Sequence, residues 1–245
     1  MQAGIRQILI ITTPEDAKVY EALLGNGQNW GLEIQYATQP KPEGLAQAFI
    51  IGEEFIGGSR VCLILGDNIF YGNGIEETLR KAAYRENGAS IFAYYVNDPE
   101  RYGVVVLNDK NKPIDLEEKP AAPKSNYAVT GIYMYDSAVV GVAKSIEPSA
   151  RGELEITDVN KAYLERDALK VEFFGRGTAW LDTGTHSSLL DASNFVRTLT
   201  ERQGLQVGSP AEVAYNLKWI TKDELAKHAE TFQKNKYGQY LEALE

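Results

Sequence analysis

The apolar positions along the first hundred residues predict strands that alternate with helices. Short apolar runs, typical of strands, occupy residues 7–12, 32–37, 61–65 and 89–96. Segments with apolar residues on one helical face lie between them, at 13–24, 45–55 and 75–86. This alternation is typical of a doubly wound, mostly parallel sheet. The run at 61–65 is continuously apolar, which predicts a parallel strand covered on both faces.

The pattern changes after residue 100. Two short strands, at 102–107 and 113–117, flank the turn at 108–111, which predicts an antiparallel hairpin. Further strands are expected at 127–135, 169–175 and 178–184, and helices at 138–146, 155–166, 187–203 and through the tail from 210 to 245. The predicted fold is therefore α/β, with a Rossmann-like sheet, a short antiparallel section and a helical C-terminal extension. We interpret 1–245 as one domain in three parts, 1–100, 101–185 and 186–245.

Composition narrows the classes of function. The 245 residues carry a formal net charge of −9, which argues against non-specific binding to nucleic acid or to an anionic membrane. Hydrophobic residues make up 44% of the chain, which is ordinary for a globular protein with a core. Cys62 is the only cysteine, so no internal disulfide forms and a reducing cytoplasm is expected. We find no apolar run long enough for a membrane span, and no signal peptide.

Two strands of the predicted sheet deliver a carboxylate. Asp67 follows the run at 61–65, and Asp182 lies near the end of the strand at 178–184. Ligands of open α/β sheets bind outside the carboxyl ends of the strands, and Mg²⁺ binds through carboxylates and substrate phosphates. Both residues are therefore candidate metal ligands. Each is equally consistent with an aspartate that caps a turn.

Two loops carry residues suited to a nucleotide or a sugar phosphate. The loop at 39–44 reads QPKPEG and leads into a predicted helix, whose N–H groups can receive an anion or a base edge. A segment of this kind is more often a plain strand-to-helix connection. Glu118 suits sugar hydroxyls and Lys119 a phosphate, although charged turn residues are more often simply solvated. Trp180 can stack on a ligand, although a tryptophan in an apolar strand is more often core.

Seven motifs, which together cover essentially the whole chain, strengthen these hypotheses. They are QPKPEGLAQA at 39–48, LGDN at 65–68, RYGVV at 101–105, LEEKP at 116–120, SNYAVTGIYMYD at 125–136, RGELEITDVN at 151–160 and AWLDTGT at 179–185. In this order they closely resemble the sugar-1-phosphate nucleotidyltransferases, and above all the glucose-1-phosphate thymidylyltransferases among them. Each motif alone is weak to moderate, and seven in register make a strong signal.

The resemblance implies a role for each candidate residue. Asp67 and Asp182 would hold a catalytic Mg²⁺, with Lys119 as a third catalytic residue. The thymine edge would lie against Gln39 and Gly44, with Leu45 nearby. The residues implied in binding glucose 1-phosphate are Tyr102, Gly103, Glu118, Lys119, Val129 and Tyr133, with Arg151 and Trp180 in support. Residues 1–100 would then belong to the nucleotide-binding half and 101–185 to the sugar-phosphate half.

The implied reaction joins dTTP and glucose 1-phosphate. A sugar-phosphate oxygen attacks the α-phosphorus of dTTP, pyrophosphate leaves, and dTDP-glucose forms for deoxysugar synthesis such as that of rhamnose. Catalysis of such a transfer is mainly positioning and charge neutralisation, which agrees with the lack of a nucleophilic motif. The resemblance also implies a homo-oligomer, a tetramer in the family, with a regulatory nucleotide-sugar site.

The sequence departs from the family at its start. Family members begin with a strand, a glycine-rich loop of the GGxGTRL type that grips the triphosphate, and an SKQLLP-like segment, and neither motif is found here. The first βα unit is thus missing from the pattern. We expect reduced turnover from this chain, and three alternatives stay open: a chain that binds sugar phosphate or nucleotide without turnover, a structural partner that completes another subunit's sheet, and a uridylyl- or cytidylyltransferase relative.

Overall fold

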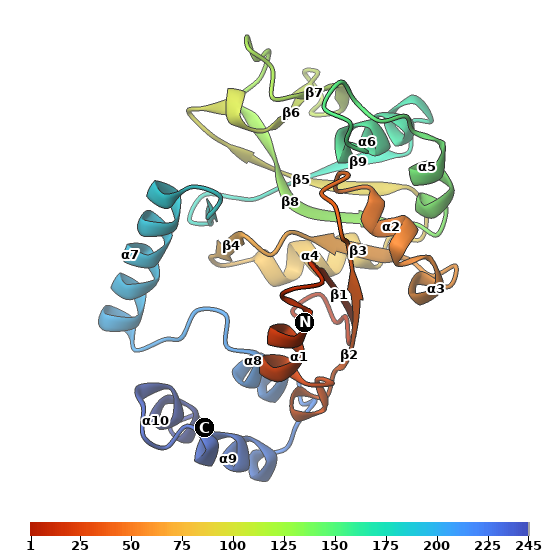
Figure 1. Ribbon diagram of the computed structural model, residues 1–245. Coiled ribbons are helices and arrows are strands. Elements are labelled where there is room, and N and C mark those ends of the chain that lie inside the picture. The colour runs from red at the N-terminus through yellow and green to blue at the C-terminus, as the bar shows by residue number, and fades with distance from the viewer. Residues whose placement is uncertain (245) are drawn as a thin grey trace. The chain divides into compact units, whose positions relative to one another are not determined.

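The computed structural model describes residues 1–244 and divides the chain into two compact units. Unit 1 combines Met1–Ala37 with residues 181–244, and unit 2 comprises Thr38–Trp180. Strands and helices are mixed along the chain, as Figure 1 shows, and the predicted α/β class is confirmed. The three-part division at residues 100 and 185 stays a prediction. Within residues 1–244, no helix combines the length and the apolar character that a membrane span requires.

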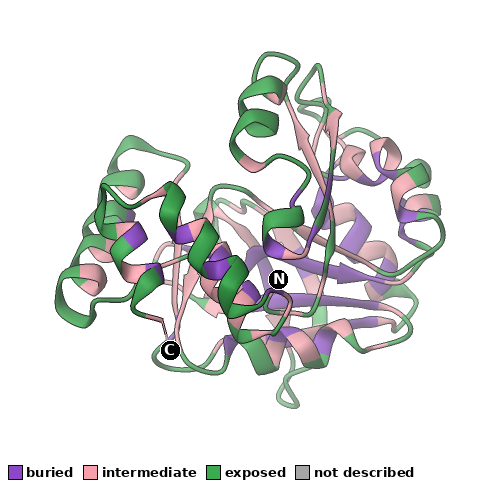
Figure 2. Cartoon of the chain, turned by 90° about the horizontal axis from the view of Figure 1, so that it is seen from below, coloured by how far each residue is buried: buried purple, intermediate pink, exposed green. Residues whose placement is uncertain are grey.

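Unit 2 is built on a mixed sheet of six strands, hydrogen-bonded in the order β7-β6-β8-β5-β9, with β3 also paired to β8. The strands are β3 (Val61–Ile64), β5 (Ala89–Tyr95), β6 (Gly103–Leu107), β7 (Pro113–Glu118), β8 (Tyr127–Tyr135) and β9 (Leu169–Phe173). The hairpin predicted around residues 108–111 is confirmed, because β6 and β7 pair antiparallel across that turn. The central strand β8 is almost wholly buried, and Figure 2 shows the buried strands in purple.

The prediction for residues 61–65 is wrong in its direction and its burial. β3 runs antiparallel to β8, with Val61 opposite Tyr135 and Ile64 opposite Ile132. Three of its residues are half-buried, and Ile64 is 59% exposed. An apolar run indicates that a strand has apolar surroundings, but it does not predict the direction of the neighbouring strand. The parallel pair of the sheet lies instead between β5 and β9.

Helices pack on the sheet of unit 2, as expected of an α/β fold. The predicted mostly parallel order is wrong for this sheet, because β5 and β9 run parallel whereas β8 runs antiparallel to β3, β5 and β6, and β6 runs antiparallel to β7. The helices are α2 (Gln47–Ile51), α3 (Glu53–Ile56), α4 (Ile75–Ala83), α5 (Val139–Ser145) and α6 (Ile156–Glu165), with the short 3₁₀ turn η2 (Pro99–Arg101) before β6. Residues from α2, α5 and α6 join Ala89, Ile91 and Ala93 of β5 in one core. Ser90, also on β5, accepts a hydrogen bond from Arg85, a residue that follows α4. The single helix predicted at 45–55 is wrong, because Gly52 separates α2 from α3.

A second, two-stranded sheet pairs β4 (Asn68–Tyr71) with β10 (Ala179–Asp182), and the boundary between the units falls inside β10, after Trp180. Residue 72, directly after β4, must be a glycine, because a Cβ there would lie 2.7 Å from the carbonyl oxygen of Gly177. The peptide that leaves β4 therefore packs directly on the peptide that enters β10.

Unit 1 joins the two ends of the chain. Its elements are β1 (Gln7–Thr12), α1 (Ala17–Leu24), the 3₁₀ turn η1 (Gln28–Trp30), β2 (Glu33–Thr38), α7 (His186–Gln203), α8 (Pro210–Asn216), α9 (Lys222–Thr231) and α10 (Lys236–Glu242). Its core packs Trp30, Leu32 and Ile34 against residues of α8, α9 and α10. The helical C-terminal extension predicted from the sequence therefore packs on the first strands of the chain. Thr221 and Glu224 form a capping box that begins α9.

Candidate functional site

Glu118 lies at the centre of a group of polar residues in unit 2. It ends β7 and stands opposite Gly103 at the start of β6. The glycine makes room for the carboxylate, because a Cβ at residue 103 would lie 3.2 Å from Glu118 Oε2. The hairpin therefore brings together two of the residues named from the sequence.

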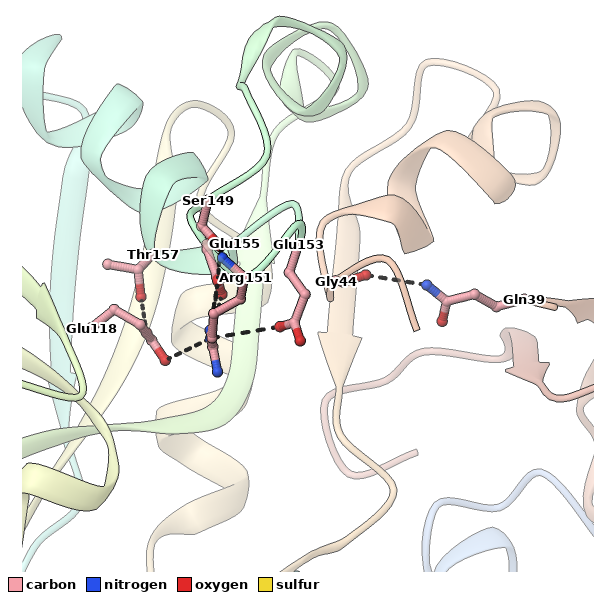
Figure 3. Close-up of polar contacts among 8 residues, drawn as sticks. All are labelled: Gln39, Gly44, Glu118, Ser149, Arg151, Glu153, Glu155 and Thr157. Atoms are coloured by element: carbon pink, nitrogen blue, oxygen red, sulfur yellow. Dashed lines mark hydrogen bonds and ion pairs between the residues drawn. The ribbon is translucent and has the colours of Figure 1, made fainter. Parts of the chain in front are cut away.

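Side chains from a separate helix and loop hold the Glu118 carboxylate. The hydroxyl of Thr157, in the first turn of α6, donates to Glu118 Oε2 at 2.5 Å. The guanidinium of Arg151, from the loop before α6, lies 3.9 Å from Glu118 Oε1. Figure 3 shows both residues directed at the carboxylate. Each oxygen of Glu118 thus faces a different partner.

Arg151 is surrounded by carboxylates. It donates to both oxygens of Glu155, at 2.9 and 3.0 Å, and lies 3.5 Å from Glu153. The hydroxyl of Ser149 also donates to Glu155, as Figure 3 shows. The hydrogen bonds with Glu155 raise the pKa of the Arg151 guanidinium above its ordinary value. The cluster carries more negative than positive charge, so a cationic or hydrogen-bond-donating group finds acceptors beside Arg151.

Aromatic side chains lie next to this polar group. The ring of Trp180 lies 5.0 Å from that of Tyr102 and 5.8 Å from that of Tyr94, centroid to centroid. The indole N–H of Trp180 donates to Asn68 Oδ1 at 2.6 Å. Flat rings held at such distances present apolar surface on which the face of a sugar can pack. Tyr102 and Trp180, both named from the sequence, are therefore brought together.

Asn68 connects three parts of unit 2. Its amide oxygen accepts from Trp180 and from the N–H of Gly131 on β8, and its amide nitrogen donates to Asp67 Oδ1 at 2.7 Å. A Cβ at residue 131 would lie 2.7 Å from the Asn68 side chain, so Gly131 is the residue that admits it. No role was predicted for Asn68 from the sequence beyond its place in the motif at 65–68. The contact with Gly131 spans 63 positions in sequence, and no local pattern carries it.

Tyr133 is a buried phenol whose pKa is influenced by the charges of both Glu118 and Asp67. It lies on β8 and is 4% exposed. Burial raises the pKa of the Tyr133 phenol strongly, and the negative charges of Glu118 and Asp67 raise it further. Both carboxylates are thus near enough to act on one hydroxyl. Val129, on the same strand, is 8% exposed and pairs with Ala93 of β5.

Lys119 has an unusual backbone. Its φ of 41° is left-handed, which is rare for residues other than glycine and costs about 1–2 kcal/mol. Its N–H donates to the carbonyl of Tyr102 at 3.1 Å, so the hairpin holds this conformation, and its side chain is exposed. Strain of this kind concentrates at ligand sites. The backbone from which the exposed Lys119 side chain extends is thereby fixed next to Glu118.

The loop predicted to receive a base is held chiefly through its backbone. Gln39 Nε2 donates to the carbonyl of Gly44 at 3.2 Å, as Figure 3 shows. Gly44 has a φ of 104°, and a Cβ there would lie 2.3 Å from the carbonyl oxygen of Leu154. The N–H of Leu154 donates to Glu43, and the N–H of Ala46 donates to Leu154. The loop is therefore fastened to the segment that carries Arg151. Leu45 is 41% exposed.

The predicted metal ligands belong to different units. Asp67 follows β3 in unit 2, and Asp182 ends β10 in unit 1, so their pairing stays a prediction. Within residues 1–244, no group of three or more histidine, cysteine, aspartate or glutamate side chains is placed to hold a metal ion. The predicted Mg²⁺ site has two protein carboxylates, Asp67 and Asp182, which is fewer than the three side chains that define such a group.

The sequence is similar to those of known proteins along most of its length. A family model described as nucleotidyl transferase matches residues 1–198. Glucose-1-phosphate thymidylyltransferase from Xanthomonas campestris is 55% identical over all of this chain and 83% of its own length. The enzyme of the same name from Mycobacterium tuberculosis is 53% identical over 98% of this chain and 83% of its own.

Solved structures share the fold. A Bacillus anthracis protein in complex with a sucrose superposes with a TM-score of 0.75 at 42% identity, over 85% of this chain and 81% of its own. A UDP-glucose pyrophosphorylase complexed with UDP-glucose gives a TM-score of 0.68 at 23% identity, over 81% of this chain and 83% of its own. The second likeness is one of fold alone.

Proposed function

The chain belongs to the nucleotidyl transferase family, and from this premise we propose that it transfers a thymidylyl group from dTTP to glucose 1-phosphate. The observation that carries the proposal is the 55% identity, across the whole chain, to the glucose-1-phosphate thymidylyltransferase of Xanthomonas campestris. An oxygen of the sugar phosphate forms a bond to the α-phosphorus of dTTP, and the bond from that phosphorus to the pyrophosphate breaks. The products are dTDP-glucose and pyrophosphate.

The residues of unit 2 support a sugar-phosphate site. Glu118 accepts hydrogen bonds from sugar hydroxyls, because an ionised carboxylate is an acceptor with two oxygens. Lys119, held beside it, neutralises charge on the phosphate. Tyr102 and Trp180 offer apolar ring surface to the sugar. Gly103 and Arg151 border Glu118 and are proposed to belong to the same site, and the motifs add Val129 and Tyr133 to it.

The nucleotide is proposed to bind at the loop that contains Gln39, Gly44 and Leu45. An amide side chain suits the donor and acceptor edge of thymine, and Gln39 is held against the carbonyl of Gly44. Leu45 adds exposed apolar surface beside it.

A divalent cation fits the donors that this chain offers. Asp67 is exposed and its carboxylate is oriented by Asn68, and oxygen donors of this kind suit Mg²⁺. Asp67 and Asp182 would hold the ion. It would supply charge neutralisation for the phosphates.

We further propose that the chain works in the cytoplasm as a homo-oligomer.

A pyrophosphate-release assay tests the proposal, with the 245-residue chain, Mg²⁺, glucose 1-phosphate and, in separate reactions, dTTP, UTP and CTP. Release with dTTP well above the other two supports it, and a preference for UTP or CTP overturns the nucleotide assignment. Calorimetric titration with glucose 1-phosphate separates binding from turnover. Heat without pyrophosphate identifies the sequence-based alternative, a chain that binds sugar phosphate without turnover, and no heat at millimolar ligand overturns the sugar site.

A further inference from the structure

We propose that Thr157 is a positioning residue that orients the Glu118 carboxylate toward a hydroxyl of the bound sugar. The proposal rests on the function proposed above and deepens it. No role has been assigned to Thr157 so far. It lies on α6, whereas Glu118 lies on the hairpin of β6 and β7. Its 39 positions of separation from Glu118 explain why no local motif connects the two residues.

The contact between Thr157 and Glu118 is close and enclosed. The Thr157 hydroxyl donates to Glu118 Oε2 at 2.5 Å, and Thr157 is 4% exposed. A Cβ at residue 103 would lie 3.2 Å from Glu118 Oε2 and 3.4 Å from Thr157 Oγ1. Gly103 therefore borders both groups, and a glycine there leaves space for them to meet.

The direction of this hydrogen bond is fixed by chemistry. An ionised carboxylate only accepts, so the threonine hydroxyl must be the donor. A β-branched side chain has few χ1 rotamers, and this restricts where the hydroxyl can point. Thr157 thus anchors Oε2 and leaves Oε1 on the side of Arg151.

Anchoring one oxygen prepares the other for a ligand. A carboxylate that can rotate must be ordered when the sugar binds, and that ordering weakens binding. A buried hydroxyl that already holds the carboxylate removes this cost. We therefore expect Thr157 to act on sugar affinity and on discrimination between sugars, with little effect on the chemical step.

Calorimetry with glucose 1-phosphate measures the effect on the 245-residue chain and is independent of turnover. Thr157→Val removes the hydroxyl at nearly constant volume, and we expect the Kd to rise about tenfold, as for the loss of a hydrogen bond to a charged group. Thr157→Ser keeps the hydroxyl, and the Kd should stay within about twofold of wild type. Thermal unfolding verifies that each variant is folded. Thr157→Ala removes the hydroxyl without placing a methyl against Glu118, and it takes the place of Thr157→Val if that variant is not folded.

A double-mutant cycle separates positioning from general structure. In an E118Q background, loss of the Thr157 hydroxyl should change the Kd clearly less than it does in wild type, because both substitutions act through one carboxylate. The same is expected of monodeoxy sugar phosphates. The affinity lost when glucose 1-phosphate is replaced by one of its 2-, 3- and 4-deoxy analogues should be smaller for T157V than for wild type. Where turnover is measurable, KM for the sugar should rise and kcat should hold.

The outcomes distinguish this inference from the proposed function. If wild type binds glucose 1-phosphate and the hydroxyl-free variants bind it equally well, the role of Thr157 is overturned and the function stands. Additive effects of T157V and E118Q overturn it as well, because they show that the two groups act separately. If wild type gives no heat with glucose 1-phosphate, the proposed sugar site fails and takes this inference with it.

Discussion

Trp180 in unit 2 and Trp30 in unit 1 are both shielded indoles, and their N–H groups differ. Trp180 donates to Asn68 at 2.6 Å, whereas the buried Nε1 of Trp30 has no hydrogen-bond partner among residues 1–244. The site residues around Trp180 are joined in the same way: Thr157 bonds to Glu118, Arg151 to Glu155, and Asn68 to Gly131. In unit 1, Trp30 instead packs against apolar and aromatic side chains, among them His228.

This difference separates a region organised for a ligand from one organised for stability. Polar groups that are partly buried must be paired, and pairing fixes their geometry, which is what a binding site requires. An apolar core needs only volume and complementary shape, and it tolerates a small number of unpaired donors at some cost in stability. Substitutions in the polar cluster around Glu118 should therefore change ligand binding, and those in the apolar core around Trp30 should change stability alone.

Gly44→Ala should have the largest effect. The new Cβ would lie 2.3 Å from the carbonyl oxygen of Leu154 and 2.4 Å from its nitrogen, at a φ of 104°. Overpacking and left-handed strain together should cost roughly 3–4 kcal/mol in the free energy of unfolding. Chemical denaturation measures this, and titration with dTTP should show weakened binding.

Gly58→Ala is the matched control for Gly44→Ala. Residue 58 also has a positive φ, 78°, and no atom of the described part of the chain, residues 1–244, lies within 4 Å of a Cβ built there. The control should cost about 1–2 kcal/mol, from backbone strain alone. Equal losses for the two variants would show that the approach of Leu154 to Gly44 is unimportant.

Glu118→Gln tests the polar site directly. The substitution keeps the shape of the side chain and removes the charge that strengthens its hydrogen bonds to a sugar. We expect affinity for glucose 1-phosphate, measured by calorimetry, to fall about 100-fold, which is about 2.7 kcal/mol. Glu117→Gln is the control, because Glu117 precedes it on β7 and pairs instead with the exposed Lys124, at 2.6 Å. A loss of similar size for the control would contradict the assignment of Glu118.

Several parts of this arrangement were predictable from the sequence and others were not. The hairpin around residues 108–111 and the strand at 127–135 followed from period and turn chemistry, because those signals are local. The direction of β3 did not, because it depends on pairing with β8, about seventy residues later along the chain. The candidate residues were named from motifs. The side chains that hold them, Thr157 and Asn68, were missed because their contacts join distant segments.

The two tryptophans give a smaller and more discriminating test of the comparison between the units. Trp180→Phe keeps a ring beside Tyr102 and deletes the N–H donated to Asn68, so the free energy of unfolding should fall by about 1 kcal/mol. Trp30→Phe deletes a buried donor that has no partner in the part of the chain that the structure describes, which should offset part of the lost packing. Chemical denaturation of both variants is the measurement. A greater loss for Trp30→Phe would show that volume, rather than hydrogen bonding, distinguishes these sites.

His228 supplies the smallest expected effect, a dependence of stability on pH in unit 1. Burial lowers the pKa of its imidazole below the ordinary value of about 6.5, and its ring packs against those of Trp30 and Phe232. Below about pH 6.5 the unfolded chain binds a proton that the folded chain takes up only at lower pH, so the folded state loses stability as the pH falls through this range. Above about pH 6.5 both states are neutral and the contribution is constant. Chemical denaturation at several pH values, for wild type and for His228→Gln, isolates the effect because the other titrating groups are common to both proteins. The fall in stability between pH 7 and pH 5.5 should be smaller for the variant, and equal slopes would show that His228 is as well solvated in the folded chain as in the unfolded one.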